Sequence, residues 1–223
     1  MANVVITGAN RGIGLELAKL FAARGDSVTG ICRETSEELE DIADQVISGI
    51  DLTQEESLGA IATLLEQLLD GPLDLLINNA GLFTNETLTS MDFDAIQRQF
   101  DINAMVPLKL TMVLLPFMTN GSKIANITSR MGSVSDNTSG SYYGYRASKA
   151  ALNAFGKSLA MDLKPQGIAV AQLHPGFVKT RMVGFNGDIT PQEAAQGLAA
   201  RIDELTLETS GGFWHSNGQA LPW

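Results

Sequence analysis

Short apolar runs alternate with helix-patterned segments along the whole chain, and this alternation constrains the fold more than any other feature. The runs are nearly continuous, which is typical of parallel strands whose two faces are both covered. Between them, apolar residues recur at helical spacing, as at Leu58, Ile61 and Leu65. The expected strands are residues 3–7, 27–32, 45–51, 73–79, 123–128, 168–173 and 213–215.

Regular strand–helix alternation predicts right-handed parallel crossovers, and therefore a doubly wound α/β sheet of about seven strands with helices on both faces. No repeat, low-complexity tract or linker interrupts the pattern, so we expect one domain over residues 1–223. The expected helices are residues 12–24, 54–69, 91–118 with an interruption near Pro107, 142–164 and 191–207.

Charge and composition argue against several classes of protein. With 15 basic and 25 acidic residues, the formal net charge is −10, which disfavours nucleic acid or an anionic membrane as a partner. No apolar stretch is expected to reach the roughly 18 residues of a membrane-spanning helix. The single Cys32 cannot form an internal disulfide, and the N-terminus lacks a signal-peptide pattern, so we expect a cytoplasmic protein. No spacing of His, Cys, Asp and Glu indicates a metal site.

Ligands of doubly wound sheets bind at the carboxyl ends of the strands. The first of these positions carries the turn TGANRGIG, residues 7–14, between a strand and a helix. Its glycines, Gly8, Gly12 and Gly14, permit a tight turn and close approach of a ligand to the backbone. The N–H groups and the dipole at the start of the next helix suit a pyrophosphate. The spacing is G-x-x-x-G-x-G rather than G-x-G-x-x-G, and its context predicts a dinucleotide site.

The residues after the second strand bear on which dinucleotide binds. NAD is usually selected by an acidic residue about 20 positions beyond the turn, and Glu34 lies at that distance. The strand ends near Cys32, however, and Arg33 follows it, with Arg11 as a second cation inside the turn. Two guanidinium groups can hold a 2′-phosphate through charge-assisted hydrogen bonds. We therefore expect NADP(H) rather than NAD(H); the alternative is that Glu34 binds the ribose and both arginines are solvated.

The segment SGSYYGYRASK contains all three tyrosines of the chain. Two pairs within it share the same spacing of four: Tyr142 with Arg146, and Tyr145 with Lys149. On a helix this spacing puts both side chains on one face. A cation there lowers the pKa of a phenol and so favours proton transfer near neutral pH. The spacing alone does not distinguish the two pairs.

Motifs that follow one another along essentially the whole chain resemble those of the short-chain dehydrogenase/reductase family. Within the family, the segment around the tyrosines looks most like the branch that contains C-factor and the sniffer-type carbonyl reductases. The motifs are T-G-x-x-x-G-x-G at 7–14, N-N-A-G at 78–81, Asn103, Ser129 in NITSRMGS, Tyr145-x-x-x-Lys149, P-G-x-V-x-T at 175–180 and the tail from residue 211.

The resemblance implies a Rossmann-type domain that transfers a hydride between a nicotinamide and a carbonyl or alcohol carbon. It selects Tyr145 as the general acid or base, and Lys149 as the cation that tunes it and binds the nicotinamide ribose. Ser129 would donate a hydrogen bond to the substrate oxygen, with Ser133 as a rival. Asn103 would anchor a water in a proton relay, the alternative being a satisfied buried amide.

The resemblance also implies which residues line the dinucleotide. Asp51 would contact the adenine, residues 79–81 the adenine ribose, and residues 175–180 the nicotinamide. The full set is Gly8, Asn10, Arg11, Gly12, Ile13, Gly14, Arg33, Asp51, Leu52, Asn79, Ala80, Gly81, Tyr145, Lys149, Pro175, Gly176, Val178 and Thr180.

The implied partners are a small-molecule carbonyl or alcohol substrate and further copies of the chain, as a homodimer or homotetramer. Only ten residues separate Thr180 from Pro191, and so short a lid suggests a pocket that is open or completed by a partner chain. Met182, Val183 and Phe185 suggest an apolar lip that suits a lipophilic carbonyl compound. His174 is interpreted as a loop residue because tyrosine fills the acid–base role.

The alternative function is a C-factor-like regulatory or signalling protein with weak or no turnover.

Overall fold

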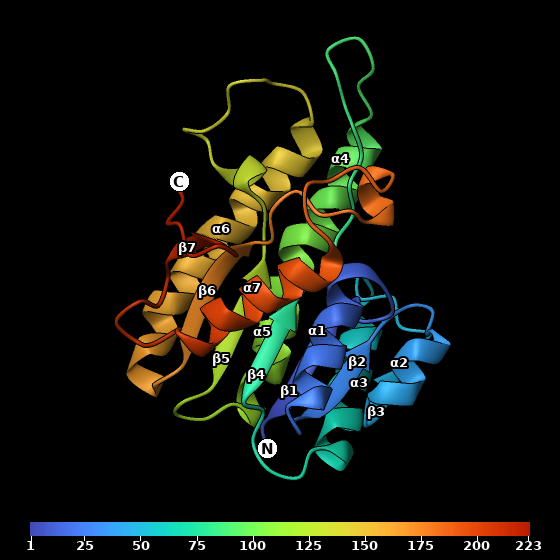
Figure 1. The fold of residues 1–223 in the computed structure, drawn as a ribbon, viewed down its shortest axis with the longest axis vertical. Coiled ribbons are helices and arrows are strands. Elements are labelled where there is room, and N and C mark those ends of the chain that lie inside the picture. The colour runs from blue at the N-terminus through green and yellow to red at the C-terminus, as the bar shows by residue number, and fades with distance from the viewer.

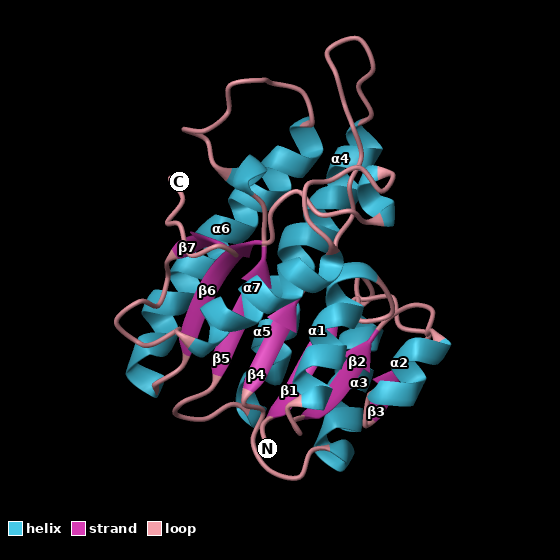
Figure 2. Ribbon diagram, viewed as in Figure 1, coloured by secondary structure: helices cyan, strands magenta, loops and turns pink.

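Seven parallel strands form one sheet in the computed structural model, which describes residues 1–223 (Figures 1 and 2). Their order across the sheet is β3-β2-β1-β4-β5-β6-β7, and every pairing is parallel. The order reverses between β1 and β4, so the predicted doubly wound fold is confirmed. The strands are β1 (Asn3–Thr7), β2 (Ser27–Ile31), β3 (Gln45–Ile47), β4 (Leu75–Asn78), β5 (Lys123–Ile127), β6 (Ala169–His174) and β7 (Phe213–His215).

Helices cover both faces of the sheet, and each face has its own apolar core (Figure 1). Successive residues of a strand point to opposite faces, so Val4 and Ile6 lie in one core while Val5 lies in the other. This is why the strands have continuous apolar sequences. One face carries α1 (Gly12–Ala23), α2 (Glu37–Ile42) and α7 (Pro191–Asp203); the other carries α3 (Glu55–Leu68), α5 (Val106–Leu114) and α6 (Tyr143–Leu163).

The structure departs from the expected elements in four places. Helix α2, capped by Ser36 and buried only at Leu39, had no predicted counterpart. Strand β3 ends well before residue 51. Helix α7 ends at Asp203 instead of 207. The segment 91–118 divides into α4 (Phe93–Phe100), a π-helical turn (Asp101–Met105), α5 and a 3₁₀ turn (Leu115–Phe117), so the interruption lies just before Pro107.

The continuous helical run Phe93–Phe117 is long and apolar enough to cross a membrane by length and composition alone. This differs from the expectation that no stretch would qualify. The core helix of a globular protein passes the same test, and here Leu110 and Leu114 are fully buried in the core on the α5 face.

Three buried amides cross the sheet in register beneath α6. The side chain of Asn78 on β4 donates to Asn126 on β5 at 2.9 Å, and Asn126 donates to Gln172 on β6 at 3.0 Å. Gly156 of α6 lies directly over Gln172, because a Cβ at that position would stand 1.9 Å from the Gln172 Oε1 atom. This amide row therefore sets how closely the long helix approaches the sheet.

The carboxyl ends of all strands lie at one edge of the sheet, as parallel order requires. The α4 segment, the loop before it and the start of α6 rise above that edge (Figure 1). The turns after β1, β4 and β5 and the segment after β6 therefore converge on the base of these elements.

Candidate active site

The glycine turn after β1 has the backbone conformation that its sequence predicts. Gly8 and Gly12 have φ of 67° and 58°, in the left-handed region that favours glycine. A Cβ at Gly14 would lie 2.3 Å from the Gly8 carbonyl oxygen, so no side chain fits there. The first N–H groups of α1 have no side-chain cap at Arg11 and remain available to a ligand.

Polar contacts from the N-N-A-G segment hold this turn in place. The Asn79 side chain donates to the carbonyl oxygens of Thr7 and Gly8 at 2.9 and 3.2 Å. The Thr7 hydroxyl accepts from the backbone N–H groups of Asn79 and Ala80, both at 3.0 Å. Thr7, which the sequence placed only within the motif, is thus a structural anchor, and Asn79 fixes the turn.

At the end of β2, Cys32 occupies the position next to the strand, and Arg33 and Glu34 follow it, both exposed. Cys32 is buried, whereas Arg33 and Arg11 are exposed, and neither arginine forms an ion pair. Nearby, the Asp51 carboxylate accepts hydrogen bonds from the backbone and hydroxyl of Thr53, which lower its pKa.

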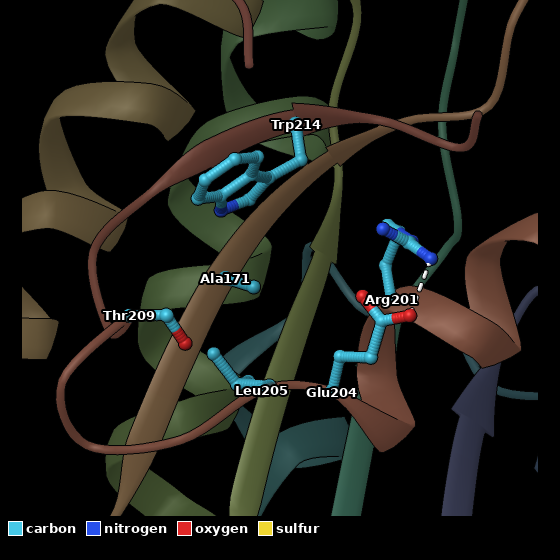
Figure 3. Close-up of a pocket in the computed structure, with 6 residues that line it drawn as sticks. All are labelled: Ala171, Arg201, Glu204, Leu205, Thr209 and Trp214. Atoms are coloured by element: carbon cyan, nitrogen blue, oxygen red, sulfur yellow. Dashed lines mark hydrogen bonds and ion pairs between the residues drawn. The ribbon is translucent and has the colours of Figure 1, made fainter. Parts of the chain in front are cut away.

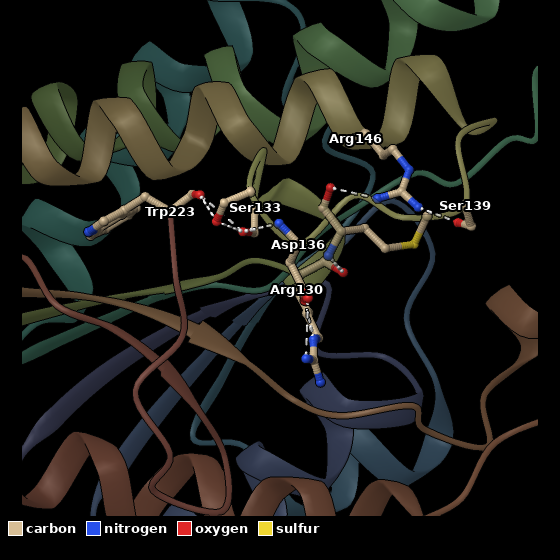
Figure 4. Close-up of polar contacts among 9 residues, drawn as sticks. Arg130, Ser133, Asp136, Ser139, Arg146 and Trp223 are labelled. Atoms are coloured by element: carbon tan, nitrogen blue, oxygen red, sulfur yellow. Dashed lines mark hydrogen bonds and ion pairs between the residues drawn. The ribbon is translucent and has the colours of Figure 1, made fainter.

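The geometry separates the two tyrosine–cation pairs. Lys149 is buried, donates to the Ile127 carbonyl at 2.8 Å, and its ammonium lies 5.8 Å from the centre of the Tyr145 ring. Arg146 donates instead to the segment before α6, including the Ser139 hydroxyl at 2.9 Å (Figure 4). Of the two cations, only Lys149 is therefore buried beside its tyrosine, Tyr145.

Burial governs the protonation of both residues. It raises the pKa of Tyr145 to about 12, with a hydrogen bond from Ser129 acting in the opposite direction. It lowers the pKa of Lys149 to about 8. The expected lowering of the tyrosine pKa is not found, because the loss of hydration on burial penalises the phenolate.

Of the two candidate serines, only Ser129 has its hydroxyl beside the tyrosine. Its oxygen accepts from the Met131 N–H at 3.1 Å, and its O–H donates to the Tyr145 hydroxyl. Ser133 is more deeply buried, and its hydroxyl donates to the Trp223 carbonyl at 3.1 Å and accepts from Asp136 N–H at 3.2 Å (Figure 4). The contacts therefore favour Ser129.

The Asn103 side chain lies in the π-helical turn, fully buried. Its oxygen accepts from Leu82 N–H at 2.7 Å, and its amide donates to the Leu82 carbonyl at 2.8 Å and to Ser148 Oγ at 3.0 Å. Ser148 in turn donates to the Tyr145 carbonyl at 2.9 Å. The side chain thus matches the alternative of a satisfied amide, and it ties the loop after β4 to α6. Sequence reasoning did not single out Ser148.

The segment after β6 borders the site on the remaining side. The methyl group of Thr180 lies 3.6 Å from where a Cβ of Gly12 would stand, so the segment reaches the glycine turn. Pro175 accepts from the Ser216 hydroxyl at 2.9 Å, which joins the segment to the tail. Burial lowers the pKa of His174 to about 3, so its imidazole is neutral and unsuited to exchange protons near pH 7.

The structure thus brings together the four predicted catalytic residues and the glycine turn. A separate cavity of about 90 Å³ lies between α7 and β7 and contains none of the predicted site residues (Figure 3). It is lined by Ala171, Arg201, Glu204, Leu205, Thr209 and Trp214.

A glycine turn entering a helix at the switch point of a doubly wound sheet defines the Rossmann-type dinucleotide-binding class. Residues 2–190 match the short chain dehydrogenase family, and the chain belongs to that family. It is accordingly an oxidoreductase of this family.

Two curated relatives agree with this placement. The chain is 39% identical over its full length, and over that of the relative, to the 1-hydroxy-2-glutathionyl-2-methyl-3-butene dehydrogenase of Rhodococcus sp. (strain AD45). It is 42% identical to the C-signal protein of Myxococcus xanthus over 69% of this chain and 94% of that one.

Two solved structures superpose on essentially the whole chain. The NADPH-bound carbonyl reductase from chicken fatty liver has a TM-score of 0.91 at 29% identity, covering 100% of this chain and 99% of the other. The carbonyl reductase Sniffer of D. melanogaster has a TM-score of 0.91 at 31% identity, with both chains fully covered. The predicted likeness to C-factor and sniffer-type proteins is consistent with these matches.

Proposed function

We propose that this chain is an NADP(H)-dependent oxidoreductase that acts on a carbonyl or alcohol carbon. The observation that carries the proposal is the pair of Tyr145 and the buried Lys149, with the Ser129 hydroxyl bonded to Tyr145. The NADPH-bound chicken carbonyl reductase supports the choice of cofactor.

The residues present fit this cofactor. The glycine turn is so tight that no Cβ fits at Gly14, and the first turn of α1 offers N–H groups that would hold a pyrophosphate. Arg11 and Arg33, exposed and without ion-pair partners, would hold the 2′-phosphate. When bound, the cofactor supplies the hydride for the carbonyl carbon in the reductive direction.

The chain's own residues manage the proton at the carbonyl oxygen. With a pKa of about 12, the Tyr145 phenol is protonated at neutral pH and can donate from Oη as negative charge develops on that oxygen. The Ser129 hydroxyl donates to the same oxygen and holds the carbonyl in place. The Lys149 ammonium uses one proton on the Ile127 carbonyl, leaving two to stabilise the phenolate and bind the ribose.

The assay that tests this function follows NADPH absorbance against a panel of ketones and aldehydes, with NADH in parallel. The reverse direction uses NADP⁺ and alcohols, including a glutathione-conjugated alcohol, because of the name of the Rhodococcus relative. Turnover with at least one compound is expected. Tight NADPH binding without turnover of any of them would favour the regulatory alternative.

Replacing Arg33 with serine tests the cofactor preference. Loss of charge-assisted bonds to the 2′-phosphate should raise the Kd for NADPH about tenfold or more, and leave that for NADH unchanged. Fluorescence titration of both cofactors measures this, with Arg98→Ser as a control at an exposed arginine that pairs with Asp92. An equal loss for the two cofactors would contradict the assignment.

The pH dependence of reduction should follow Lys149. As pH rises through about 8, this side chain loses its proton and the positive charge that stabilises the developing phenolate. Tyr145 itself stays protonated to much higher pH. We expect kcat/KM for reduction to fall above about pH 8, measured from pH 6 to 10 with saturating NADPH. A flat profile to pH 10 would contradict this role.

A further inference from the structure

We propose that Glu86 is a positioning residue for the acid–base tyrosine, because its carboxylate caps helix α6 and holds the turn that carries Tyr145. The inference rests on the proposed function, since it concerns the geometry of the same proton transfer. Glu86 lies in the loop between β4 and α4, outside the set of residues expected from the sequence.

Glu86 is 2% exposed and forms no ion pair with any lysine or arginine. Hydrogen bonds compensate for its burial instead. One carboxylate oxygen accepts from the Gln99 amide at 3.0 Å and from the Thr84 hydroxyl. The other accepts from the backbone N–H of Gly144 at 3.0 Å. Three donors thus fix the carboxylate at the start of α6, where the helix dipole also favours negative charge.

The first turn of α6 lacks any local means of satisfying its N–H groups. Its capping residue, Tyr142, makes no side-chain cap bond, and both Ser141 and Tyr142 have φ of 55°, a left-handed conformation that strains non-glycine residues. Glu86 supplies what is missing: its backbone carbonyl accepts from Tyr142 N–H at 2.9 Å, and its carboxylate from Gly144 N–H. These two contacts hold the strained entry immediately before Tyr145.

The fit around this cap is close. Gly144 must be glycine, because a Cβ there would lie 2.3 Å from Gln99 Nε2 and 2.9 Å from Ile96 Cα. Gln99 is itself fully buried, and its oxygen accepts from Thr84 N–H at 3.0 Å. A continuous chain of hydrogen bonds therefore links the loop, through Gln99 and Glu86, to α6.

The same loop also contacts the tyrosine ring. Phe83 meets Tyr145 edge-on with ring centres 4.9 Å apart and stacks on Tyr142 at 5.6 Å. Glu86 thus fixes, through one short segment, both the backbone under Tyr145 and the aromatic side chain against it. A displacement of about 1 Å between a catalytic group and the reacting atom lowers the rate roughly a hundredfold.

The test compares Glu86→Gln with the double variant Glu86→Gln/Gln99→Glu. In the single variant, one carboxylate oxygen becomes an NH₂ group. This NH₂ group must face either the Gln99 amide NH₂ or the Gly144 N–H, and both of these are donors. In the double variant, the carboxylate at position 99 accepts from that amide, and the amide oxygen accepts from Gly144 N–H. We expect kcat for NADPH-dependent reduction to fall at least about tenfold in the single variant and to recover to within about threefold in the double variant.

The Kd for NADPH and the KM for the carbonyl compound should change by less than about threefold, since no contact to either is removed. Asp92→Asn is the matched control: this carboxylate caps α4 through Ala95 N–H at 2.9 Å, and α4 carries no acid–base residue. Its kcat should equal that of the wild type. A kcat in Glu86→Gln within about twofold of the wild type, or a folded double variant without recovery, would overturn the proposal.

Hydrogen exchange provides a readout that does not depend on activity. The peptide spanning residues 142–148 should exchange faster in Glu86→Gln and return towards the wild-type rate in the double variant. If the wild type shows no turnover, the proposed function is wrong. The hydrogen-exchange rates then test separately whether Glu86 holds the start of α6. Should Glu86→Gln be too unstable to fold, the recovery of kcat in the double variant decides it.

Discussion

Replacing Tyr145 with phenylalanine should lower kcat by about a hundredfold to ten-thousandfold, the usual contribution of a positioned general acid. The variant loses only the hydroxyl, so the ring keeps its edge-on contact with Phe83. Cofactor binding should persist, because the glycine turn and the arginines are untouched. Steady-state reduction assays and NADPH titration together separate the loss of proton transfer from a loss of binding.

Tyr142→Phe is the matched control. It also removes a tyrosine hydroxyl, but from the pair that Tyr142 forms with Arg146. The Tyr142 ring stacks on Phe83, and the Arg146 guanidinium is engaged with the loop before α6. We expect activity within about threefold of the wild type. The reverse pattern, with Tyr142→Phe inactive and Tyr145→Phe active, would overturn the assignment of the acid.

Replacing Gly14 with alanine should abolish tight cofactor binding. The added Cβ would stand 2.3 Å from the Gly8 carbonyl oxygen and 2.5 Å from the Asn79 side chain that holds the turn. Relief of that clash must open the turn and displace the N–H groups of α1. We expect the Kd for NADPH to rise about a hundredfold or more, with about 1–3 kcal/mol lost from the free energy of unfolding. Titration calorimetry and denaturant unfolding measure the two effects.

Gly59→Ala provides the control for the same chemical change. Gly59 lies in α3, and nothing stands within 4 Å of an added Cβ. Alanine there should stabilise the protein by about 0.5–1 kcal/mol through helix propensity, with NADPH affinity unchanged. A Gly14→Ala variant that binds NADPH as tightly as Gly59→Ala does would show that the turn is not the phosphate site.

The elements that could be predicted are those with a local signal. Each of the seven strands was expected, and only β6 extends beyond its expected range, by one residue to His174. A parallel strand buried on two faces must be apolar throughout, which gives it a local signal. Helix α2 escaped prediction because EELEDI buries only Leu39 and so has no apolar repeat. The π-helical turn contains Asn103, whose side chain bonds to Leu82, 21 residues away, and no local pattern encodes such a contact.

The same division applies to the site. The motifs predicted that Tyr145 and Lys149 share one helix face and that a glycine turn follows the first strand; the structure has the pair in α6 and the turn directly after β1. From the sequence FTNETL alone, Glu86 would be taken for an exposed acidic residue of a loop. Only the fold brings it into contact with Gly144, 58 residues further along the chain. The raised pKa of Tyr145 also required the structure, because burial is a property of the packed molecule. The catalytic roles, the oligomeric state and the cytoplasmic location stay predictions.

The row of buried amides beneath α6 also limits how this sequence can diverge. Losing any one of Asn78, Asn126 and Gln172 would leave a neighbour unpaired away from water, at a cost of about 1–3 kcal/mol, whereas a joint exchange for apolar residues of matching shape can be nearly neutral. Residues 48 and 46 positions apart are thus coupled in their contribution to stability. Substitutions at these sites should be epistatic, and homologues should carry either the whole polar row or none of it.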